Sequence, residues 1–251
     1  MARDRPPYRA DHIGSLIRPA QLLCARYPTD GQNLQAEELK AIEDRQIRNV
    51  ISMQEDIGLQ SITDGEFRRE SWRLGLVSKV SGFTRTDAVG DVDYQHGSKG
   101  HRHRIGNAPI ATSKVERAGP IVADEVAFTL SHTTATAKAT IPSPSYLHYP
   151  RGCACVDDAV YPDLDQYFED VVHLYRRELK AICETGCCYL QFDEVVQALL
   201  CDETIRLALK ERGDCPDALC LLYIDLINRI IRDRPPQLCV TLHMCRGNAM
   251  G

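Results

Sequence analysis

His243 and Cys245 stand two residues apart, directly behind the apolar run at 238–242. Side chains alternate along an extended strand, so residues i and i+2 project to the same side and can reach one metal ion. A neutral imidazole nitrogen and a thiolate are donors that suit zinc. The spacing therefore indicates a metal site, although a buried histidine and cysteine at a strand end would give the same short motif.

Acidic residues follow two other apolar runs. Asp64 and Glu66 come directly after 59–63, and Asp193 and Glu194 come after 188–192. If these runs are strands, the carboxylates lie where substrates are bound in α/β proteins. Two alternatives stay open. The first acidic pair could lie in a solvated turn at Gly65, neutralised by the following arginines, and the second could hold an arginine rather than a ligand.

Strands and helices must alternate to bring these residues together. Hydrophobic periodicity, capping residues and Gly or Pro stops predict helices at 36–57, 121–132, 163–186, 202–212 and 217–232. Strands or strand ends are predicted at 11–17, 59–63, 108–115, 137–141, 188–192 and 238–242. Such alternation predicts a parallel sheet with right-handed crossovers. We expect one α/β domain over 1–251, derived from a (β/α)8 TIM barrel but lacking its last two β/α units, with a polar insertion loop at 83–107.

Composition excludes several classes of protein. The net charge of −5 argues against a nucleic-acid partner, and no apolar run is long enough to span a membrane. The first residues carry charges without an apolar signal segment, so we expect a cytoplasmic protein whose eleven cysteines are mostly reduced. The His101–Arg104 cluster is interpreted as a solvated loop rather than a metal or anion site.

Four motifs together resemble one known family. They are His12-Ile-Gly-Ser15 with Arg18-Pro19, Thr63-Asp-Gly-Glu-Phe-Arg-Arg69, Tyr189-Leu-Gln-Phe-Asp-Glu194 and Leu242-His-Met-Cys-Arg-Gly-Asn248. In this order they resemble the catalytic barrel of the cobalamin-independent methionine synthases, and more closely their stand-alone, synthase-like relatives. Trp72 follows the acidic motif as it does in those relatives. The resemblance spans nearly the whole chain.

The resemblance implies a zinc-activated thiol whose sulfur attacks an alkyl donor. Zinc deprotonates a coordinating thiol, whereas a free thiol with a pKa of about 8.5 is only slightly ionised at neutral pH. His243 and Cys245 match two zinc ligands, and Glu66 and Asp193 match carboxylates that hold the substrate amino group. Ser15, with Arg18, is expected to hold the carboxylate end of the substrate. Glu194 is expected to be a further substrate-binding residue.

The same resemblance marks what this sequence lacks. The family's other zinc ligands, an acidic residue and a second cysteine, lie beyond the His-x-Cys motif, and the 251 residues end before them. We therefore expect a barrel truncated after this motif, with zinc as cofactor only where something completes the site. No folate-binding features are matched, so the expected donor is not methylfolate.

Three functions follow as hypotheses. The first is zinc-dependent alkyl or methyl transfer to a thiol on a small amino-acid-like substrate. The second is a metal-free tailoring enzyme that uses Glu66, Asp193 and His243 for acid–base chemistry. The third is a non-catalytic remnant that binds a partner chain. Because an incomplete barrel exposes strand edges, we expect a homodimer or a completing partner chain.

Overall fold

The computed structural model describes residues 5–28, 34–71, 74–84, 93–96, 101–104 and 108–245. Its centre is a parallel sheet in the order β1 (Ser61–Ile62), β6 (Thr136–Pro142), β7 (Tyr189–Asp193) and β8 (Cys239–His243). All the residues of β7 are buried, as expected for a central strand of a parallel sheet. The register pairs Pro142 with Asp193 and Asp193 with His243, so the carboxyl ends of three strands meet at one edge.

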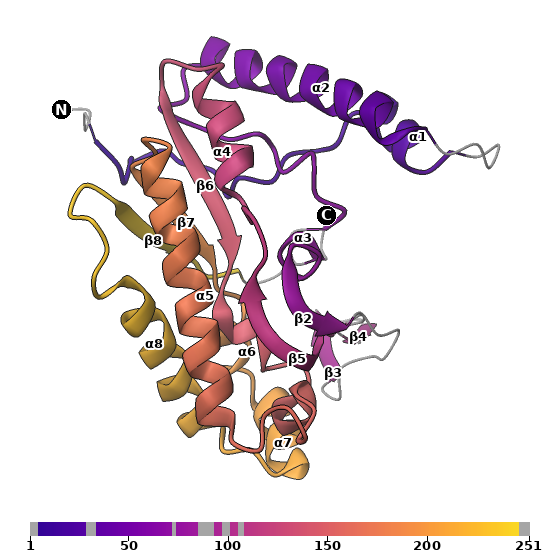
Figure 1. Cartoon of the computed structure of the whole chain (residues 1–251), viewed down its shortest axis with the longest axis vertical. Helices are drawn as coiled ribbons and strands as arrows, with labels where there is room; N and C mark the ends of the chain where they lie inside the picture. Colours follow the sequence, from indigo (N-terminus) through magenta and orange to yellow (C-terminus); the bar gives the residue numbers. More distant parts are fainter. Residues whose placement is uncertain are drawn as a thin grey trace.

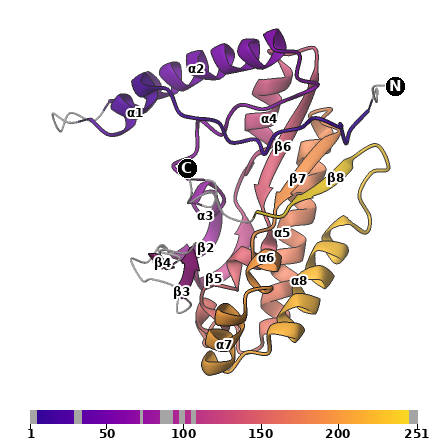
Figure 2. The ribbon, with the colours of Figure 1, turned by 180° about the vertical axis from the view of Figure 1, so that it is seen from behind.

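Long helices cover one face of this sheet. Figures 1 and 2 show α5 (Leu164–Glu184) and α8 (Pro216–Ile231) side by side against it. Asp163 caps α5 by accepting a hydrogen bond from the Asp165 backbone nitrogen, and Gly186 follows its end with φ +92°. Tyr175 and Leu179 of α5 pack in the same core as Leu190 of β7. Each such buried side chain contributes about 1.5–3 kcal/mol through removal from water.

A second, smaller core lies at the other end of the molecule. Here α1 (Ala20–Arg26) and α2 (Ala36–Asp56) pack against β1 and Phe67. Both helices lie at the end of the molecule opposite α7 (Glu203–Arg212) in Figures 1 and 2. The remaining short elements are α3 (Leu74–Val77), α4 (Ala123–Leu130), α6 (Val196–Leu199) and the 3-10 turns η1 (Pro144–Leu147) and η2 (Gly152–Cys155).

The strand predicted at 108–115 does not belong to the parallel sheet. Residues Ile110–Arg117 form β5, which pairs antiparallel with β2 (Val80–Thr84). Ala111 and Val115 are buried, but the three residues between them are exposed. A strand that is half solvated suits an antiparallel ribbon, whereas a parallel strand must be buried on both faces. Residues 11–17, predicted as a strand end, form no strand either. The described parallel sheet therefore has four strands rather than the six that we predicted.

The polar region at 83–107 is not wholly a loop. Asp93–His96 forms β3 and His101–Arg104 forms β4, paired antiparallel with each other between β2 and β5 in the chain. Backbone hydrogen bonds pair the two strands of such a hairpin whatever its side chains are. The polar sequence has no alternation of apolar residues that could predict these strands. The histidine and arginine side chains of β4 lie outside the described residues.

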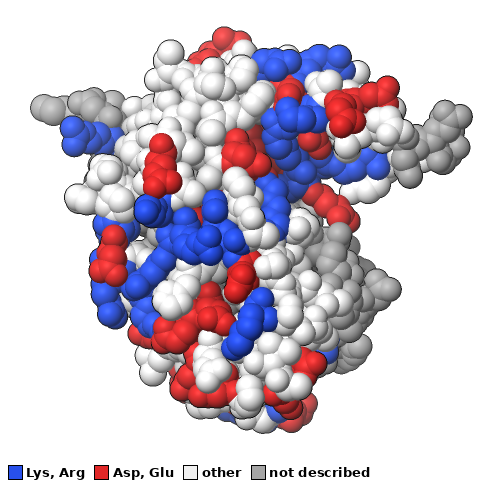
Figure 3. Space-filling model, in the orientation of Figure 1, with Lys and Arg blue, Asp and Glu red and all other residues white. Residues whose placement is uncertain are grey.

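The surface carries both signs of charge. Figure 3 shows acidic and basic side chains across the face seen in Figure 1. Among the residues that the structure describes, no helix is long and apolar enough to cross a membrane.

Candidate active site

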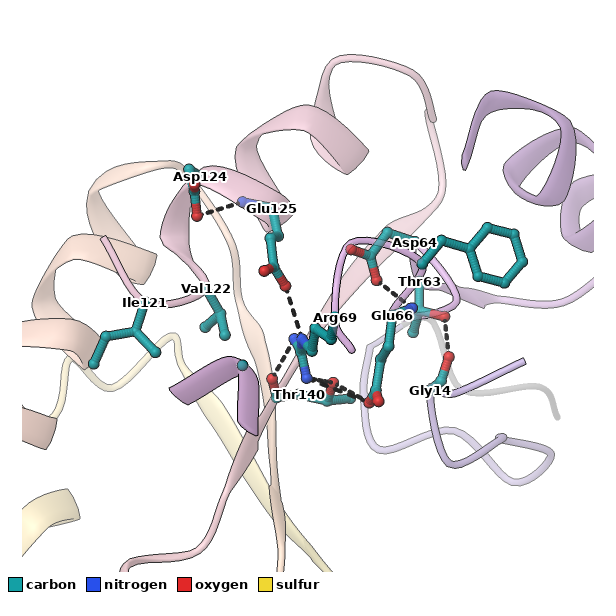
Figure 4. A network of polar contacts seen from close by, with 12 residues as sticks. Gly14, Thr63, Asp64, Glu66, Arg69, Ile121, Val122, Asp124, Glu125 and Thr140 are labelled. Carbon is teal, nitrogen blue, oxygen red and sulfur yellow. Dashed lines mark hydrogen bonds and ion pairs between the residues drawn. The ribbon is translucent and has the colours of Figure 1, made fainter. Parts of the chain in front are cut away.

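The turn after β1 presents Glu66 to the interior. Gly65 and Glu66 both have positive φ, +68° and +60°, and the Glu66 backbone nitrogen donates to Asp64 Oδ1 at 2.8 Å. Thr63 donates through its hydroxyl to the Gly14 carbonyl at 2.7 Å (Figure 4). A left-handed backbone is unfavourable for glutamate, and such strain is typical of functional sites. The surrounding hydrogen bonds hold the turn in this form.

Two arginines clamp the same turn from outside. Arg18 Nη2 donates to the carbonyls of Glu66 at 3.2 Å and Arg69 at 3.0 Å. Arg26 donates to the carbonyls of Phe67 at 2.6 Å and Arg69 at 3.0 Å. The structure thus gives Arg18 a role in shaping the turn, and its predicted contact with a substrate carboxylate stays a prediction.

Ser15 lies on the segment that passes beside β6. Gly14 makes this approach possible, because a Cβ there would lie 2.5 Å from Thr140 Cγ2 and its φ is +105°. Ser15 itself is half-buried, next to the Leu16 backbone nitrogen that donates to the Gly65 carbonyl at 3.1 Å. The predicted substrate contact of Ser15 therefore stays a prediction, on a segment joined to the Glu66 turn.

The Glu66 carboxylate has one occupied and one open oxygen. Oε1 accepts from the Thr140 hydroxyl at 2.7 Å and lies 3.4 Å from Arg69 Nη1 (Figure 4). Oε2 is buried and has no hydrogen-bond partner among the described residues. Burial, together with the charge of Asp193, raises the pKa of Glu66 above its ordinary value of 4.5.

Arg69 anchors Glu66 to the neighbouring strand and helix. It donates to Glu125 Oε2 at 2.9 Å, to the Thr140 carbonyl at 2.8 Å and to the Thr140 hydroxyl at 3.1 Å. Lys79 also donates to Glu125, at 2.8 Å. The buried guanidinium is thus fully engaged with protein groups, and it fixes the side of Glu66 that faces away from the open oxygen.

Asp193 and His243 form the second part of the site. Asp193 Oδ1 accepts from Gln191 Nε2 at 2.7 Å and lies 3.2 Å from His243 Nδ1. No hydrogen bond from the described residues reaches Asp193 Oδ2. Since a carboxylate on one ring nitrogen orients a histidine and leaves the other nitrogen for a metal or a proton, this pairing suits both roles predicted for His243.

Glu194 has a different environment from that of Asp193. It is fully buried. Its Oε1 accepts from the backbone nitrogens of Val196 and Gln197, at 2.9 and 3.1 Å, while the hydroxyls of Ser143 and Ser145 donate to the carboxylate. Both oxygens are occupied by the protein. This geometry supports a role in starting α6 and holding the β6–η1 turn, rather than the predicted contact with substrate.

The predicted zinc ligands are only partly described. Cys245 is half-buried two residues after His243, and Arg246, Gly247 and Asn248 of the same motif lie outside the described residues. Within the described part of the chain, no group of three His, Cys, Asp or Glu side chains could hold a metal ion. A catalytic zinc site usually has three protein ligands. These residues therefore do not complete a zinc site on their own.

Several residues of the site were missed from the sequence. Thr140, Gln191 and Lys138 contact the predicted carboxylates or their partners. Arg69 was not missed, because the arginines after the acidic turn were expected to neutralise it, and Arg69 Nη1 lies 3.4 Å from Glu66 Oε1. Gln191 could have been found, because it lies two residues before Asp193 on a predicted strand and must share its face. Thr140 and Lys138 required the strand order, which places β6 between β1 and β7.

Comparison with known proteins shows the family to which this chain belongs. The sequence model of the family described as "Cobalamin-independent synthase, Catalytic domain" matches residues 10–211. This chain belongs to that family. The match includes the Glu66 turn and Asp193 and stops before His243 and Cys245.

Relatives of this synthase-family chain include proteins with and without an assigned activity. The uncharacterized protein YxjH of Bacillus subtilis is 32% identical over 97% of this chain and 63% of its own length. A methionine synthase of Pyrococcus furiosus is 25% identical over 94% of the chain and 61% of its own length. The chain thus spans less than two thirds of these curated relatives.

A solved structure supports the fold of this family member. A candidate vitamin-B12-independent methionine synthase from Listeria monocytogenes superposes with a TM-score of 0.77 at 28% identity, covering 98% of this chain and 67% of that one. This likeness confirms the predicted α/β fold of the TIM-barrel type, with helices packed on a parallel sheet.

Proposed function

We propose that this chain carries the amino-acid-binding part of a methionine synthase-like transferase, which moves a methyl or other alkyl group to a thiol. The family membership supports transfer of this kind. The observation that carries the proposal is the buried Oε2 of Glu66, which has no hydrogen-bond partner among the described residues. The negative charge of Asp193 also acts on Glu66 and raises the pKa of its carboxyl group. A buried polar atom without a partner is costly, so a ligand is expected to supply one.

A primary ammonium group fits these open oxygens. It carries a positive charge and three hydrogens, so it can donate to Glu66 Oε2 and Asp193 Oδ2 together. The charge of Asp193 raises the pKa of Glu66, so the two carboxylates repel, and a bound cation would relieve the repulsion. We therefore propose a thiol amino acid such as homocysteine as acceptor, with Ser15 as a contact for its carboxylate end.

The proposed transfer forms one bond and breaks another. The acceptor sulfur forms a bond to the transferred carbon, the bond from that carbon to the donor breaks with its electron pair moving to the donor, and the thiol proton is lost to a base. In this proposal Glu66 and Asp193 hold the ammonium and so fix where the sulfur lies. The donor is proposed to be other than methylfolate.

Zinc is proposed from the family resemblance, with His243 and Cys245 as two of its ligands, and when bound it supplies a deprotonated thiol. The described residues do not complete its ligand set, so the amine-binding carboxylates are argued independently of it.

The metal-free alternative is favoured by one observation. Asp193 Oδ1 lies 3.2 Å from His243 Nδ1, an arrangement that also prepares a histidine to accept a proton. In this alternative His243 is the general base for the thiol. The third hypothesis, a non-catalytic partner-binding remnant, predicts no ligand at the carboxylates. The predicted homodimer also stays a prediction, which light scattering at micromolar concentration checks.

Calorimetric binding of L-methionine, the product expected of this reaction, tests the proposal. We expect Glu66→Gln and Asp193→Asn to weaken binding about ten- to hundredfold, because a hydrogen bond to a charged group contributes about 1.5–3 kcal/mol. The matched controls Glu116→Gln and Asp158→Asn change exposed residues and should bind as the wild type does. Wild-type protein that does not distinguish L-methionine from its amine-free analogue, methylthiobutanoic acid, would contradict the proposal.

A further inference from the structure

A buried lysine lies behind the amine-binding carboxylates. The side chain of Lys138, on β6, is fully buried, and its ammonium group reaches three acceptors. It donates to Asp11 Oδ1 at 3.0 Å, to Gln191 Oε1 at 3.1 Å and to the His12 carbonyl. An ammonium has three hydrogens and no acceptor, so all its donors are occupied. The oxygen of the Gln191 amide must therefore face Lys138.

This orientation decides what the other end of the Gln191 amide does. Its nitrogen faces away from Lys138 and donates to the Ile13 carbonyl at 2.8 Å and to Asp193 Oδ1 at 2.7 Å. A flipped amide would place its NH2 group against the Lys138 ammonium and its oxygen against a carbonyl and a carboxylate. Both contacts would be repulsive, so a single orientation is fixed.

The fixed amide in turn selects one oxygen of Asp193. Oδ1 receives Gln191 Nε2 and faces His243 Nδ1, while Oδ2 receives no hydrogen bond from the described residues. Alternation along β7 explains why this works, since Gln191 and Asp193 point to the same face. Asp193 is thereby held with one oxygen turned to the protein and the other left for a ligand.

The hydrogen bonds of Lys138 and Gln191 also extend to the segment that carries Ser15. Asp11, which binds Lys138, also accepts from Ser61 Oγ at 2.5 Å and from the Tyr189 hydroxyl. Gln191 binds the Ile13 carbonyl in the same segment. The segment that carries Ser15 and the Asp193 carboxylate are thus joined by one set of buried and partly buried hydrogen bonds.

We propose that Gln191, held by Lys138, is a positioning residue that sets the rotamer of Asp193 for binding an ammonium group. The inference rests on the proposed function for its ligand, but the geometry that it requires can be measured without one. Neither residue is proposed to touch the substrate.

The test compares Gln191→Leu with Gln191→Glu and with the exposed control Gln166→Leu. The leucine variant removes the donor to Asp193, and the glutamate variant replaces that donor with a repelling charge. We expect both to bind L-methionine at least tenfold more weakly than the wild type, while binding of methylthiobutanoic acid, which lacks the amine, stays the same. The control variant should bind both as the wild type does.

A crystal structure of each variant gives the second measurement. We expect Asp193 Oδ1 to leave its present position in both. Where the single leucine variant does not fold, the double variant Lys138→Met/Gln191→Leu, which replaces both members of the pair with apolar side chains, is used in its place. Unchanged methionine affinity in a variant whose Asp193 has not moved would overturn the inference. If wild-type protein binds no methionine, the proposed function fails, and the position of Asp193 in the variants alone decides the positioning role.

Discussion

Glu66 combines two unfavourable features in one residue. Its backbone lies in the left-handed region at φ +60°, and its carboxylate is buried with Oε2 unpaired. Arg18, Arg26 and Arg69 hold it there through the carbonyls and the carboxylate of the turn. Structure that is maintained at a cost in stability is expected where a ligand will be bound.

The cost of burying Glu66 predicts a dependence of stability on pH. Burial and the charge of Asp193 raise its pKa above 4.5. The folded state therefore binds this proton more tightly than the unfolded chain does, so the stabilisation from the protonated group is complete below the unfolded pKa and is lost as pH rises through the folded pKa. We expect Glu66→Gln to have a higher Tm than wild type at neutral pH, and the difference to vanish below the ordinary pKa of the carboxyl group.

Thermal melts between about pH 4 and pH 8 measure this difference. The exposed Glu116→Gln serves as the control and should show none. A Glu66→Gln variant that is less stable than wild type at every pH would mean that the contact with Arg69 outweighs the burial cost.

Among the helices and strands, the sequence predicted best those whose ends and buried face are specified by nearby residues. The helices at 36–57 and 163–186 are confirmed as α2 and α5, because capping residues and a continuous apolar face specify them. The pairing partner of β5 could not be predicted, since it depends on contacts far along the chain. For the same reason the acidic residues of the site were found from their motifs, but Lys138 and Thr140, which lie on another strand, were not.

Strand β8 brings His243 opposite Asp193, but the described residues supply fewer than three ligands around it. We therefore expect zinc to be bound weakly, so that dialysis against a chelator removes it and neither His243→Ala nor Cys245→Ala changes the metal content afterwards. Elemental analysis of the dialysed protein measures this. One zinc per chain that survives the chelator and is lost in Cys245→Ala would show that a complete site exists.

At the scale of the whole molecule, the proposed site lies at the carboxyl edge of the described parallel sheet. β1 and β8 lie at the two ends of the described parallel sheet, and the chain spans 63% of the length of YxjH. The carboxylates nevertheless come from β1 and β7, which β6 holds together through Thr140 and Lys138. Both carboxylates of the proposed amine site therefore lie on elements of the described sheet or directly after them.

A crystal structure of this chain with bound L-methionine tests that claim most directly. We predict that the amino nitrogen lies within hydrogen-bond distance of Glu66 Oε2 and Asp193 Oδ2, with Gln191 still bound to Oδ1. Methionine bound with its amino group away from both carboxylates, while these oxygens stay unpaired, would contradict the account.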